Sequence, residues 1–458
     1  MAEPICALAT PPGRSAIGII RCSGDNLFPI IEDIFQTTKG KVSLAHNHRY
    51  ALHGHICENN QIVDEVILIP FRSPHSYTGE DVVEIHAHGN PIILQKIIKI
   101  LLTRGIRAAQ AGEFTRRAYL AGKIDLTQAE AVRAIIEARA ERELQLALNL
   151  KQGSFRQEIL QLRSDLLNLL ADLNAELDFI EEDITFSSRE EKIERIQKLT
   201  YSTLSLLKAG SQSERYRKGF EVAIIGAPNA GKSSLLNRLC GEERALVSEI
   251  PGTTRDYLES EITIDGISFT FLDTAGIRSH TNDILEKAGM ERSFKKAKSA
   301  DIVILLLDGS LPPQEALPQE LIVFLKSPEC KARVLSVINK KDILHHEMQK
   351  SLELPGTTLW LSAKTGEGIQ ELMDELRKAA LELLPHGDAL LLAAWQLELL
   401  EKLKAHLDNA LEMIKANSPA ELTCAEIQEA AERLAEITGE IAREDILGRI
   451  FSRFCIGK

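Results

Sequence analysis

The residues with the clearest chemistry in this sequence form a glycine-rich loop that ends in a lysine and a serine. Residues 226–233 read Gly-Ala-Pro-Asn-Ala-Gly-Lys-Ser and follow the apolar run 222–225. The glycines let backbone N–H groups close around phosphate oxygens, and the following helix adds the positive end of its dipole. Lys232 would reach the β- and γ-phosphates, and the Ser233 hydroxyl would hold Mg²⁺. The loop predicts a nucleoside triphosphate, with a chance glycine-rich turn as the alternative.

Three further motifs, each after a predicted strand, indicate which nucleotide binds. Asp273-Thr-Ala-Gly276 follows the strand at 268–272, so Asp273 can hold Mg²⁺ through water and Gly276 can sense the γ-phosphate. Asn339-Lys-Lys-Asp342 follows 334–338, and the Asp342 carboxylate can accept from the guanine N1–H and exocyclic amine, a donor pair that adenine lacks. Ser362-Ala-Lys364 follows 359–361 and would support the base. Any one motif alone is compatible with an ordinary loop, but their order predicts a GTP-binding domain.

The segment between these motifs supplies a second metal ligand but not the usual water-positioning group. Pro251-Gly-Thr-Thr-Arg-Asp256 offers two hydroxyls, and Thr254 is the natural second Mg²⁺ ligand. Ras-type GTPases place a glutamine directly after the Asp-Thr-Ala-Gly motif, whereas this chain has Ile277, so another group must position the attacking water. The alternative is a domain that binds GTP and hydrolyses it only feebly. The expected GTP contacts are Asn229, Ala230, Gly231, Lys232, Ser233, Ser234, Ser248, Glu249, Ile250, Pro251, Gly252, Thr253, Thr254, Asp273, Thr274, Ala275, Gly276, Asn339, Lys340, Asp342, Ser362, Ala363 and Lys364.

Composition restricts the compartment and the partners. The chain has 458 residues, 44% of them hydrophobic and 26% charged, as in an ordinary multidomain globular protein. No apolar run is long enough to span a bilayer and the first residues lack a secretory signal, so we expect a cytoplasmic protein without membrane contact. The seven cysteines include no C-x-x-C pair and are expected to be reduced thiols. A net charge of −12 means that RNA contact requires a local basic patch or a helper protein.

The pattern along the chain predicts three kinds of region. Residues 1–118 mix β-branched runs at 16–20, 63–69 and 81–86 with a helix at 91–102, which is typical of an α+β domain. Residues 119–218 and 382–458 are rich in Ala, Glu and Leu at helical spacing and flank the nucleotide-binding region 219–381. The economical interpretation is one discontinuous helical domain, interrupted by an inserted α/β GTPase domain.

Several phrases outside the nucleotide motifs carry a family resemblance over the whole length. They include Thr10-Pro-Pro-Gly-Arg14, Ser76-Tyr-Thr-Gly-Glu-Asp81, Ala111-Gly-Glu-Phe-Thr-Arg116, Gly252-Thr-Thr-Arg-Asp256 and the terminal Phe454-Cys-Ile-Gly-Lys458. In these the chain resembles the MnmE (TrmE) family of tRNA modification GTPases. The resemblance implies that the protein acts with the flavoprotein MnmG in a heterotetramer. Together they would add an aminomethyl or carboxymethylaminomethyl group at C5 of the tRNA wobble uridine. The tRNA would be bound mainly with MnmG.

The resemblance also implies a homodimer and a one-carbon cofactor. Members of the family pair through their N-terminal domains and bind a tetrahydrofolate derivative of the 5-formyl type. By motif, the folate contacts fall on Arg21, Glu84, Lys123 and Lys458. Arg and Lys suit the glutamate carboxylates of a folate, and a carboxylate suits its pterin edge. Without the family, each would be interpreted as a solvated surface charge.

The family resemblance supplies a catalytic cation in place of the missing glutamine. Its GTPase domains pair across the nucleotide with K⁺ near the β- and γ-phosphates, which implies K⁺ ligands at Asn229, Ser248, Ile250 and Thr253. The family commonly has threonine where this chain has Ser248, but a hydroxyl or carbonyl oxygen remains. The water-positioning carboxylate falls on Glu286. Because the spacer after Gly276 is one residue longer than the common pattern, Glu291 is the alternative.

Two questions stay open on the sequence alone. Cys455 lies three residues from Lys458 and is either a nucleophile or general base near the one-carbon unit or a buried packing residue. The alternative functions are a ribosome-assembly GTPase of the Era or Der kind, disfavoured because a KH-type signature and a second phosphate loop are missing, and a non-enzymatic folate-binding scaffold. K⁺-stimulated, multiple-turnover GTP hydrolysis would argue against the scaffold.

Overall fold

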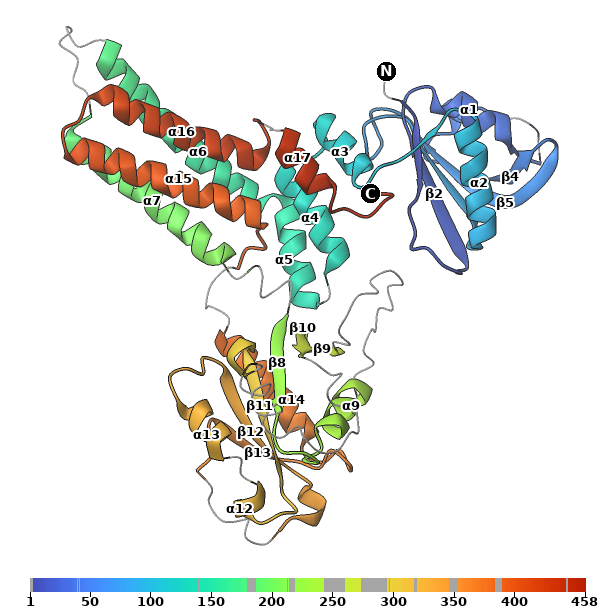
Figure 1. Ribbon diagram of the computed structural model, residues 1–458. Helices are drawn as coiled ribbons and strands as arrows, with labels where there is room; N and C mark the ends of the chain where they lie inside the picture. Colours follow the sequence, from blue (N-terminus) through green and yellow to red (C-terminus); the bar gives the residue numbers. More distant parts are fainter. Residues whose placement is uncertain are drawn as a thin grey trace. The chain divides into compact units, whose positions relative to one another are not determined.

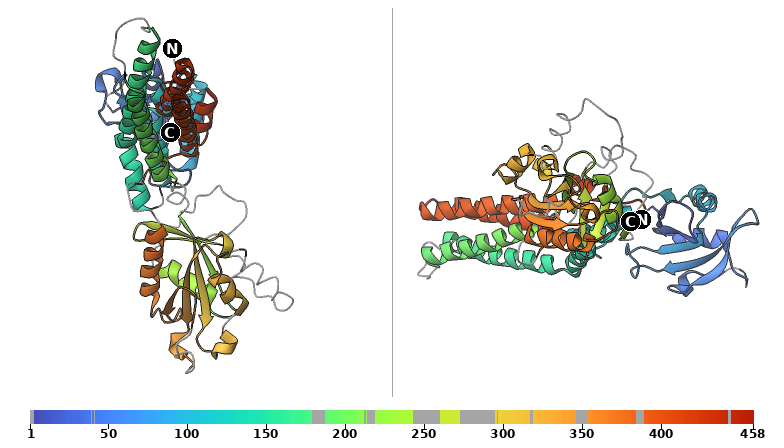
Figure 2. Two further views of the ribbon diagram at one scale, coloured as in Figure 1. Left: turned by 90° about the vertical axis from the view of Figure 1, so that its left-hand side faces the viewer. Right: turned by 90° about the horizontal axis from the view of Figure 1, so that it is seen from below.

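The computed structural model describes most of the chain and divides it into two compact units. The described residues are 3–38, 40, 42–138, 140–178, 187–211, 213, 219–242, 260–272, 295, 297–316, 319–345, 353–383, 389–441 and 444–458. One unit comprises residues 1–133, 150–203 and 398–458, and the other comprises 134–149 and 204–397. The boundaries expected at 118, 218 and 381 stay predictions. Figures 1 and 2 show the elements from three directions.

The N-terminal part of the first unit is a sheet of seven strands in the order β3-β4-β5-β6-β2-β1-β7. The bounds are β1 Ile5–Leu8, β2 Ile17–Ser23, β3 Phe35–Gln36, β4 Leu52–Glu58, β5 Gln61–Phe71, β6 Val82–His88 and β7 Arg107–Ala108. Helices α1 (Leu27–Ile34) and α2 (Pro91–Thr103) bury their apolar faces against alternate residues of the strands, including Ile20, Leu68 and Ile85. Because strand side chains alternate between faces, Arg21 of β2 and Glu84 of β6 lie on the other face, directly opposite each other in register.

The helical part of this unit joins segments that are far apart in the sequence. Helix α6 packs along α16 (Figure 1), although about 240 residues separate them. This pairing confirms a discontinuous helical domain. The helices are α3 Glu113–Leu120, α4 Leu126–Glu137, α5 Glu141–Gln152, α6 Ser154–Asp178, α7 Arg189–Gly210, α15 Ala394–Lys415, α16 Ala420–Thr438 and α17 Glu444–Phe451, of which α4, α5, α7 and α15 extend across the limits of the two units.

The second unit contains a six-stranded sheet in the order β13-β12-β11-β8-β10-β9, parallel except for the β9–β10 pair. The strands are β8 Phe220–Ile225, β9 Ser260–Ile264, β10 Ile267–Phe271, β11 Ile302–Asp308, β12 Arg333–Asn339 and β13 Thr357–Trp360. The helices are α9 Lys232–Glu242, α12 Pro313–Ala316, α13 Gln319–Lys326 and α14 Ile369–Leu383. Separate apolar cores on the two faces bury residues 302–307 of β11, as expected for a parallel sheet covered on both sides. The predicted α/β class of the inserted domain is confirmed.

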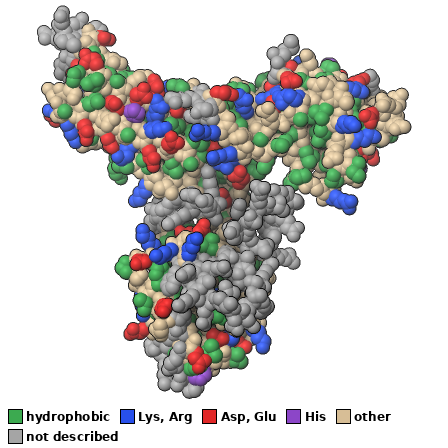
Figure 3. Space-filling model, viewed as in Figure 1, with side chains coloured by type: hydrophobic (Ala, Val, Ile, Leu, Met, Phe, Trp, Pro, Cys, Tyr) green, Lys and Arg blue, Asp and Glu red, His purple; other side chains and the backbone are tan. Residues whose placement is uncertain are grey.

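Surface charge, helix hydropathy and the state of the cysteines each bear on the expectations from composition. On the face drawn in Figure 3, basic and acidic side chains are interspersed over the described residues. Within the described residues, no helix is both long enough and apolar enough to cross a bilayer. The seven cysteines are free thiols.

Candidate nucleotide site and N-terminal ligand site

The phosphate loop runs from the end of β8 to the start of α9. Gly226 has φ +154°, and a Cβ there would lie 2.1 Å from the Leu306 carbonyl oxygen of β11, so only glycine fits. Asn229 and Gly231 also have positive φ, at +62° and +96°. These conformations turn the backbone tightly enough for the loop to lead directly into the N-terminus of α9, where backbone N–H groups and the helix dipole favour a phosphate.

Lys232, the first residue of α9, folds over the loop. Its Nζ donates to the carbonyl oxygens of Gly226 at 3.0 Å and Ala227 at 2.8 Å. The ammonium group is therefore held at the loop, where the phosphate chain of a bound nucleotide would pass. Ser233 and Ser234 follow in the first turn of α9.

Asn339 connects the phosphate loop to the loop after β13. It is buried, its Nδ2 donates to the Ala230 carbonyl at 2.8 Å, and its Oδ1 accepts from the Ala363 N–H at 2.9 Å. A Cβ at Gly231 would lie 2.2 Å from the same Nδ2, so the close approach requires glycine. A single amide thus ties three of the sequence motifs together at the carboxyl ends of β8, β12 and β13.

Asp342 presents a carboxylate that is fixed from one side. The Ser362 hydroxyl donates to its Oδ1 at 2.6 Å, and this hydrogen bond, aided by the nearby Lys364 and Lys340, lowers the pKa of Asp342. The side chain is exposed and ionised, so its remaining acceptor positions are available to a base. This is the geometry that the guanine hypothesis requires.

The structure adds Asp308, a residue that sequence reasoning missed. It ends β11, is buried, and lies 2.5 Å from the Nζ of Lys340, which has a left-handed backbone. Burial alone would raise the pKa of Asp308, but hydrogen bonds from Lys340 and Ser310 lower it. The signal in the sequence was one charged residue at the end of an otherwise apolar strand.

The remaining nucleotide-site predictions fall outside the described residues. They are Ser248, Glu249, Ile250, Pro251, Gly252, Thr253, Thr254, Asp273, Thr274, Ala275, Gly276 and Glu286. The second Mg²⁺ ligand, most of the K⁺ cage and the water-positioning carboxylate therefore stay predictions.

In the first unit, the structure brings Arg21, Glu84 and Lys458 together. Arg21 donates through Nε at 3.0 Å and Nη2 at 2.8 Å to Oε1 of Glu84, and through Nη1 at 3.2 Å to the Gly457 carbonyl. Its guanidinium lies 5.8 Å from the ring centre of Tyr77 and 5.9 Å from that of Phe114. The two rings were not predicted, although both belong to motif phrases quoted above.

The last residues of the chain lie against β1. Gly457 has φ +99°, and a Cβ there would lie 2.3 Å from the Leu8 carbonyl oxygen. Lys458 is half-buried, and its pKa is lowered by burial and by Arg21, with Glu84 acting in the opposite direction. Cys455 is exposed, so the buried-packing interpretation of this cysteine is wrong.

Lys123 lies beside the same site but makes a different contact. Its Nζ donates to the Pro74 carbonyl at 2.7 Å, and its Cγ would be 3.6 Å from a Cβ at Gly79. The contacted segment carries Tyr77, which stacks near Arg21. Lys123 thus contacts the segment that carries Tyr77 and does not contact the Arg21–Glu84 pair directly.

A second network, of hydrogen bonds and ion pairs, holds the segment that carries Tyr77 through its residue Glu80. Ser23 donates at 2.7 Å to Glu80, which also accepts from Arg117 at 2.9 Å. Arg117 donates to Glu113 at 2.9 Å, as does Arg107 at 2.6 Å. Burial raises the pKa of Glu113, but hydrogen bonds from Arg107, the Gln110 amide and Arg117 outweigh it and bring the pKa to about 2. The segment is therefore held in place by partly buried ion pairs.

The phosphate loop after β8 and the loops after β12 and β13 meet at the carboxyl ends of parallel strands. This arrangement defines a P-loop nucleotide-binding domain, which is inserted here into a helical domain. Family models agree with both parts of the chain: the MnmE helical domain matches residues 126–455, and the GTP-binding protein TrmE N-terminus matches residues 4–123. The chain belongs to the MnmE family.

The similarity to relatives extends over the full chain. The "tRNA modification GTPase MnmE" of Thermotoga petrophila is 40% identical over 461 residues, which cover 100% of both chains. The proteins of the same name from Aquifex aeolicus and Flavobacterium johnsoniae are each 40% identical, over 462 and 476 residues. They cover 100% of this chain and 100% and 99% of their own.

Proposed function

We propose that this protein is a GTP hydrolase that acts in tRNA modification. The observation that carries the proposal is the placement of Asp342, whose carboxylate is fixed by Ser362 beside loops that Asn339 ties to the phosphate loop. An ionised, exposed carboxylate at this position selects the two adjacent N–H donors of guanine and repels the acceptor edge of adenine. Membership of the MnmE family supports the tRNA role over ribosome assembly.

The first test compares nucleotides. Full-length protein with Mg²⁺ and K⁺ is expected to hydrolyse GTP over many turnovers and ATP at a far lower rate. Equal rates for the two nucleotides would contradict the guanine site. The tRNA role is tested separately, by mass analysis of wobble nucleosides from cells lacking the gene, where loss of a C5-substituted uridine is expected.

The metal ions would occupy the phosphate loop and the switch segment. Mg²⁺ would be held by Ser233 and Thr254, and K⁺ by Asn229, Ser248, Ile250 and Thr253. In support, Asn229 is exposed, with a left-handed backbone in the loop, so its side-chain oxygen is available to a hard cation. When bound, K⁺ supplies positive charge for the γ-phosphate in the transition state, while Glu286, with Glu291 as the alternative, would orient the water.

The one-carbon cofactor would bind near Arg21. A tetrahydrofolate derivative of the 5-formyl type offers carboxylates to Lys123 and Lys458 and a pterin edge to Glu84. The charges of the site support this fit. Lys458 is partly buried and lies near the like charge of Arg21, and both effects lower its pKa. An anionic ligand would stabilise the charged form of Lys458 against both effects. The exposed thiol of Cys455 lies two residues before the Gly457 carbonyl that Arg21 contacts.

The partners would be a second copy, MnmG and tRNA. The face of the N-terminal sheet opposite α1 and α2 exposes the side chains of Ile17 (57%) and Ile67 (44%). These apolar side chains support pairing of two copies through this face. The dimer would then assemble with MnmG into a cytoplasmic heterotetramer. Light scattering is expected to give a dimer for the wild type and a monomer for Ile67→Glu. A wild-type monomer would contradict the proposal. With a net charge of −12, tRNA is expected to bind mainly through MnmG.

A further inference from the structure

A group of exposed cations surrounds the turn that follows β5 in the N-terminal part of the first unit. Arg72 comes directly after β5, and its carbonyl accepts from the His75 N–H at 2.8 Å, which closes the turn. Arg49 lies against the same turn, because its N–H donates to the Pro70 carbonyl at 2.6 Å and its Nη2 to the His75 carbonyl at 3.4 Å. Arg49, Arg72 and His75 are all exposed. Two arginines from different segments are thus brought to one end of β5.

Neither arginine forms an ion pair within the described residues. The ion pairs of this part of the chain take up other cations, namely Arg21, Lys96, Arg104, Arg107, Arg116 and Arg117. The carboxylate of Asp81, which contacts the turn, accepts from the backbone N–H of Ser73 at 2.9 Å. The charges of Arg49 and Arg72 thus form a local basic patch, although the whole chain carries a net charge of −12.

An exposed aromatic residue belongs to the same patch. Tyr50 directly follows Arg49 and is 68% exposed. The backbone here is held in a defined conformation, since Arg49 has φ +65° and the Tyr50 N–H donates to the Asn47 carbonyl at 3.1 Å. Because a tyrosine side chain has only two rotatable bonds, it can stack on a flat partner at a low cost in conformational entropy.

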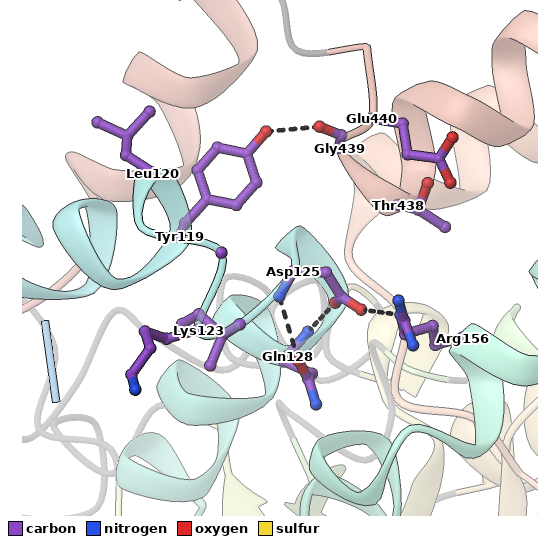
Figure 4. A pocket seen from close by; sticks show the side chains of 11 residues that line it. Tyr119, Leu120, Lys123, Asp125, Gln128, Arg156, Thr438, Gly439 and Glu440 are labelled. Carbon is purple, nitrogen blue, oxygen red and sulfur yellow. Dashed lines mark hydrogen bonds and ion pairs between the residues drawn. The ribbon is translucent and has the colours of Figure 1, made fainter. Parts of the chain in front are cut away.

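The patch borders the candidate folate site without using its ligands. Lys123, one of the expected folate contacts, donates to the Pro74 carbonyl of the same turn at 2.7 Å. Lys123 also lies in the wall of a cavity of about 550 Å³, where its side chain extends away from Arg156 (Figure 4). Asp125, which lines this cavity too, pairs with Arg156 at 2.6 Å. The two arginines of the patch therefore lie beside the folate residues and are available to a different ligand.

We propose that Arg49, Tyr50 and Arg72 form a contact surface for single-stranded RNA beside the folate site. The inference rests on the proposed tRNA role and names where this chain would touch that substrate, in addition to the contacts of MnmG. The guanidinium groups would bind backbone phosphates, and the Tyr50 ring would stack on an unpaired base. A wobble uridine lies in the single-stranded anticodon loop, which suits this combination better than a duplex does. An acidic protein would be attracted by the same charges but offers no base to the ring.

The test measures binding of a labelled anticodon stem-loop RNA to the full-length protein by fluorescence anisotropy at several salt concentrations. Arg49→Ala and Arg72→Ala should each weaken binding about fivefold. The double variant should also make the slope of log K against log salt shallower by about 1.4, because each contact to a single-stranded phosphate contributes about 0.7. Arg72→Lys should keep the wild-type slope, since the charge is retained.

Further variants separate stacking from general charge. Tyr50→Ala should weaken binding about tenfold at an unchanged salt slope, whereas Tyr50→Phe should bind as wild type. Lys99→Ala removes an exposed cation from α2, is the matched control for net charge, and should change neither affinity nor slope. Thermal unfolding curves of all variants should match wild type, because the replaced side chains are exposed.

The outcomes separate this inference from the tRNA role, which the wobble nucleosides decide independently. If the wild type does not bind the stem-loop, or the double variant keeps wild-type affinity and slope, the RNA surface is wrong. If a duplex RNA competes as well as the stem-loop and Tyr50→Ala has no effect, the arginines attract any polyanion and the proposed surface fails. If the variants bind RNA normally and lose MnmG, the patch serves a protein and the inference is overturned.

Discussion

Replacing Asn339 by alanine tests whether one buried amide holds the nucleotide site together. Asn339→Ala removes a donor from the Ala230 carbonyl and an acceptor from the Ala363 N–H. Each buried backbone group left unsatisfied costs about 1–3 kcal/mol. Allowing for partial relaxation, we expect a loss of about 3 kcal/mol in the unfolding free energy of the nucleotide domain. In a domain of this size that corresponds to a fall of about 6–12 °C in Tm.

The assay is scanning calorimetry of the full-length protein, in which the transition that GDP shifts upward is assigned to the nucleotide domain. The GDP dissociation constant of Asn339→Ala should rise by more than about tenfold, because the phosphate loop and the base loop lose their common support. Lys341→Ala is a suitable control, since its exposed ion pair with Glu367 contributes little. A GDP-sensitive transition within 1 °C of wild type, with unchanged GDP affinity, would refute the bridging role.

Four further predictions address individual groups. Asp342→Asn should move the preference from GTP towards xanthosine triphosphate, because the amide can donate where the carboxylate only accepts; competition binding checks this. Asn229→Ala should abolish stimulation by K⁺ over Na⁺ while GTP binding stays nearly intact, and an unchanged K⁺/Na⁺ rate ratio would remove Asn229 from the cation site. Glu286→Ala should lower single-turnover GTP cleavage by about 10²-fold, with Glu291→Ala mild by comparison; the reverse order would move the assignment to Glu291. Glu113, with its folded-state pKa lowered from 4.5 to about 2, stabilises the fold above pH 4.5 and loses this contribution as the pH falls towards 2. The difference in Tm between wild type and Glu113→Gln should therefore shrink across this window, and a constant difference would show that the carboxylate is not ion-paired.

The nucleotide domain was predictable because its motifs are local. The strand, loop and helix around residues 226–233 are contiguous, so glycine spacing and the apolar run before it predict β8, the phosphate loop and α9 together. The base loops likewise follow β12 and β13 directly. The Asp308–Lys340 pair joins the end of β11 to the residue after β12, and no local pattern indicates which strands are neighbours. The charge at the end of β11 could be noticed in the sequence, but its pairing with Lys340 could be found only once β11 was placed beside β12.

The N-terminal site was less predictable from residues alone, because its parts meet only through long-range pairing. Arg21 and Glu84 are 63 residues apart and become opposite neighbours through the register of β2 and β6. The rings of Tyr77 and Phe114 reach Arg21 from a loop and from α3. Family resemblance indicated the charged residues, but it gave no reason for the aromatic ones, which hold the guanidinium by stacking.

The position of the chain's last residues links this site to the helical domain. Helix α17 packs on α3, where a Cβ at Gly112 would lie 2.4 Å from the Phe451 carbonyl, and the Tyr119 and Phe451 rings are 6.3 Å apart. This contact directs the residues after α17 towards β1, so that Gly457 reaches Arg21. The same Tyr119 bonds to Gly439 at the end of α16 and lines the cavity. The insertion point lies between α7 and α15, and the chain that leaves the nucleotide domain runs through α15, α16 and α17 before it ends at Lys458. Residues from opposite ends of the sequence therefore meet at one site, because β2 pairs with β6 and the segment after α17 reaches Arg21.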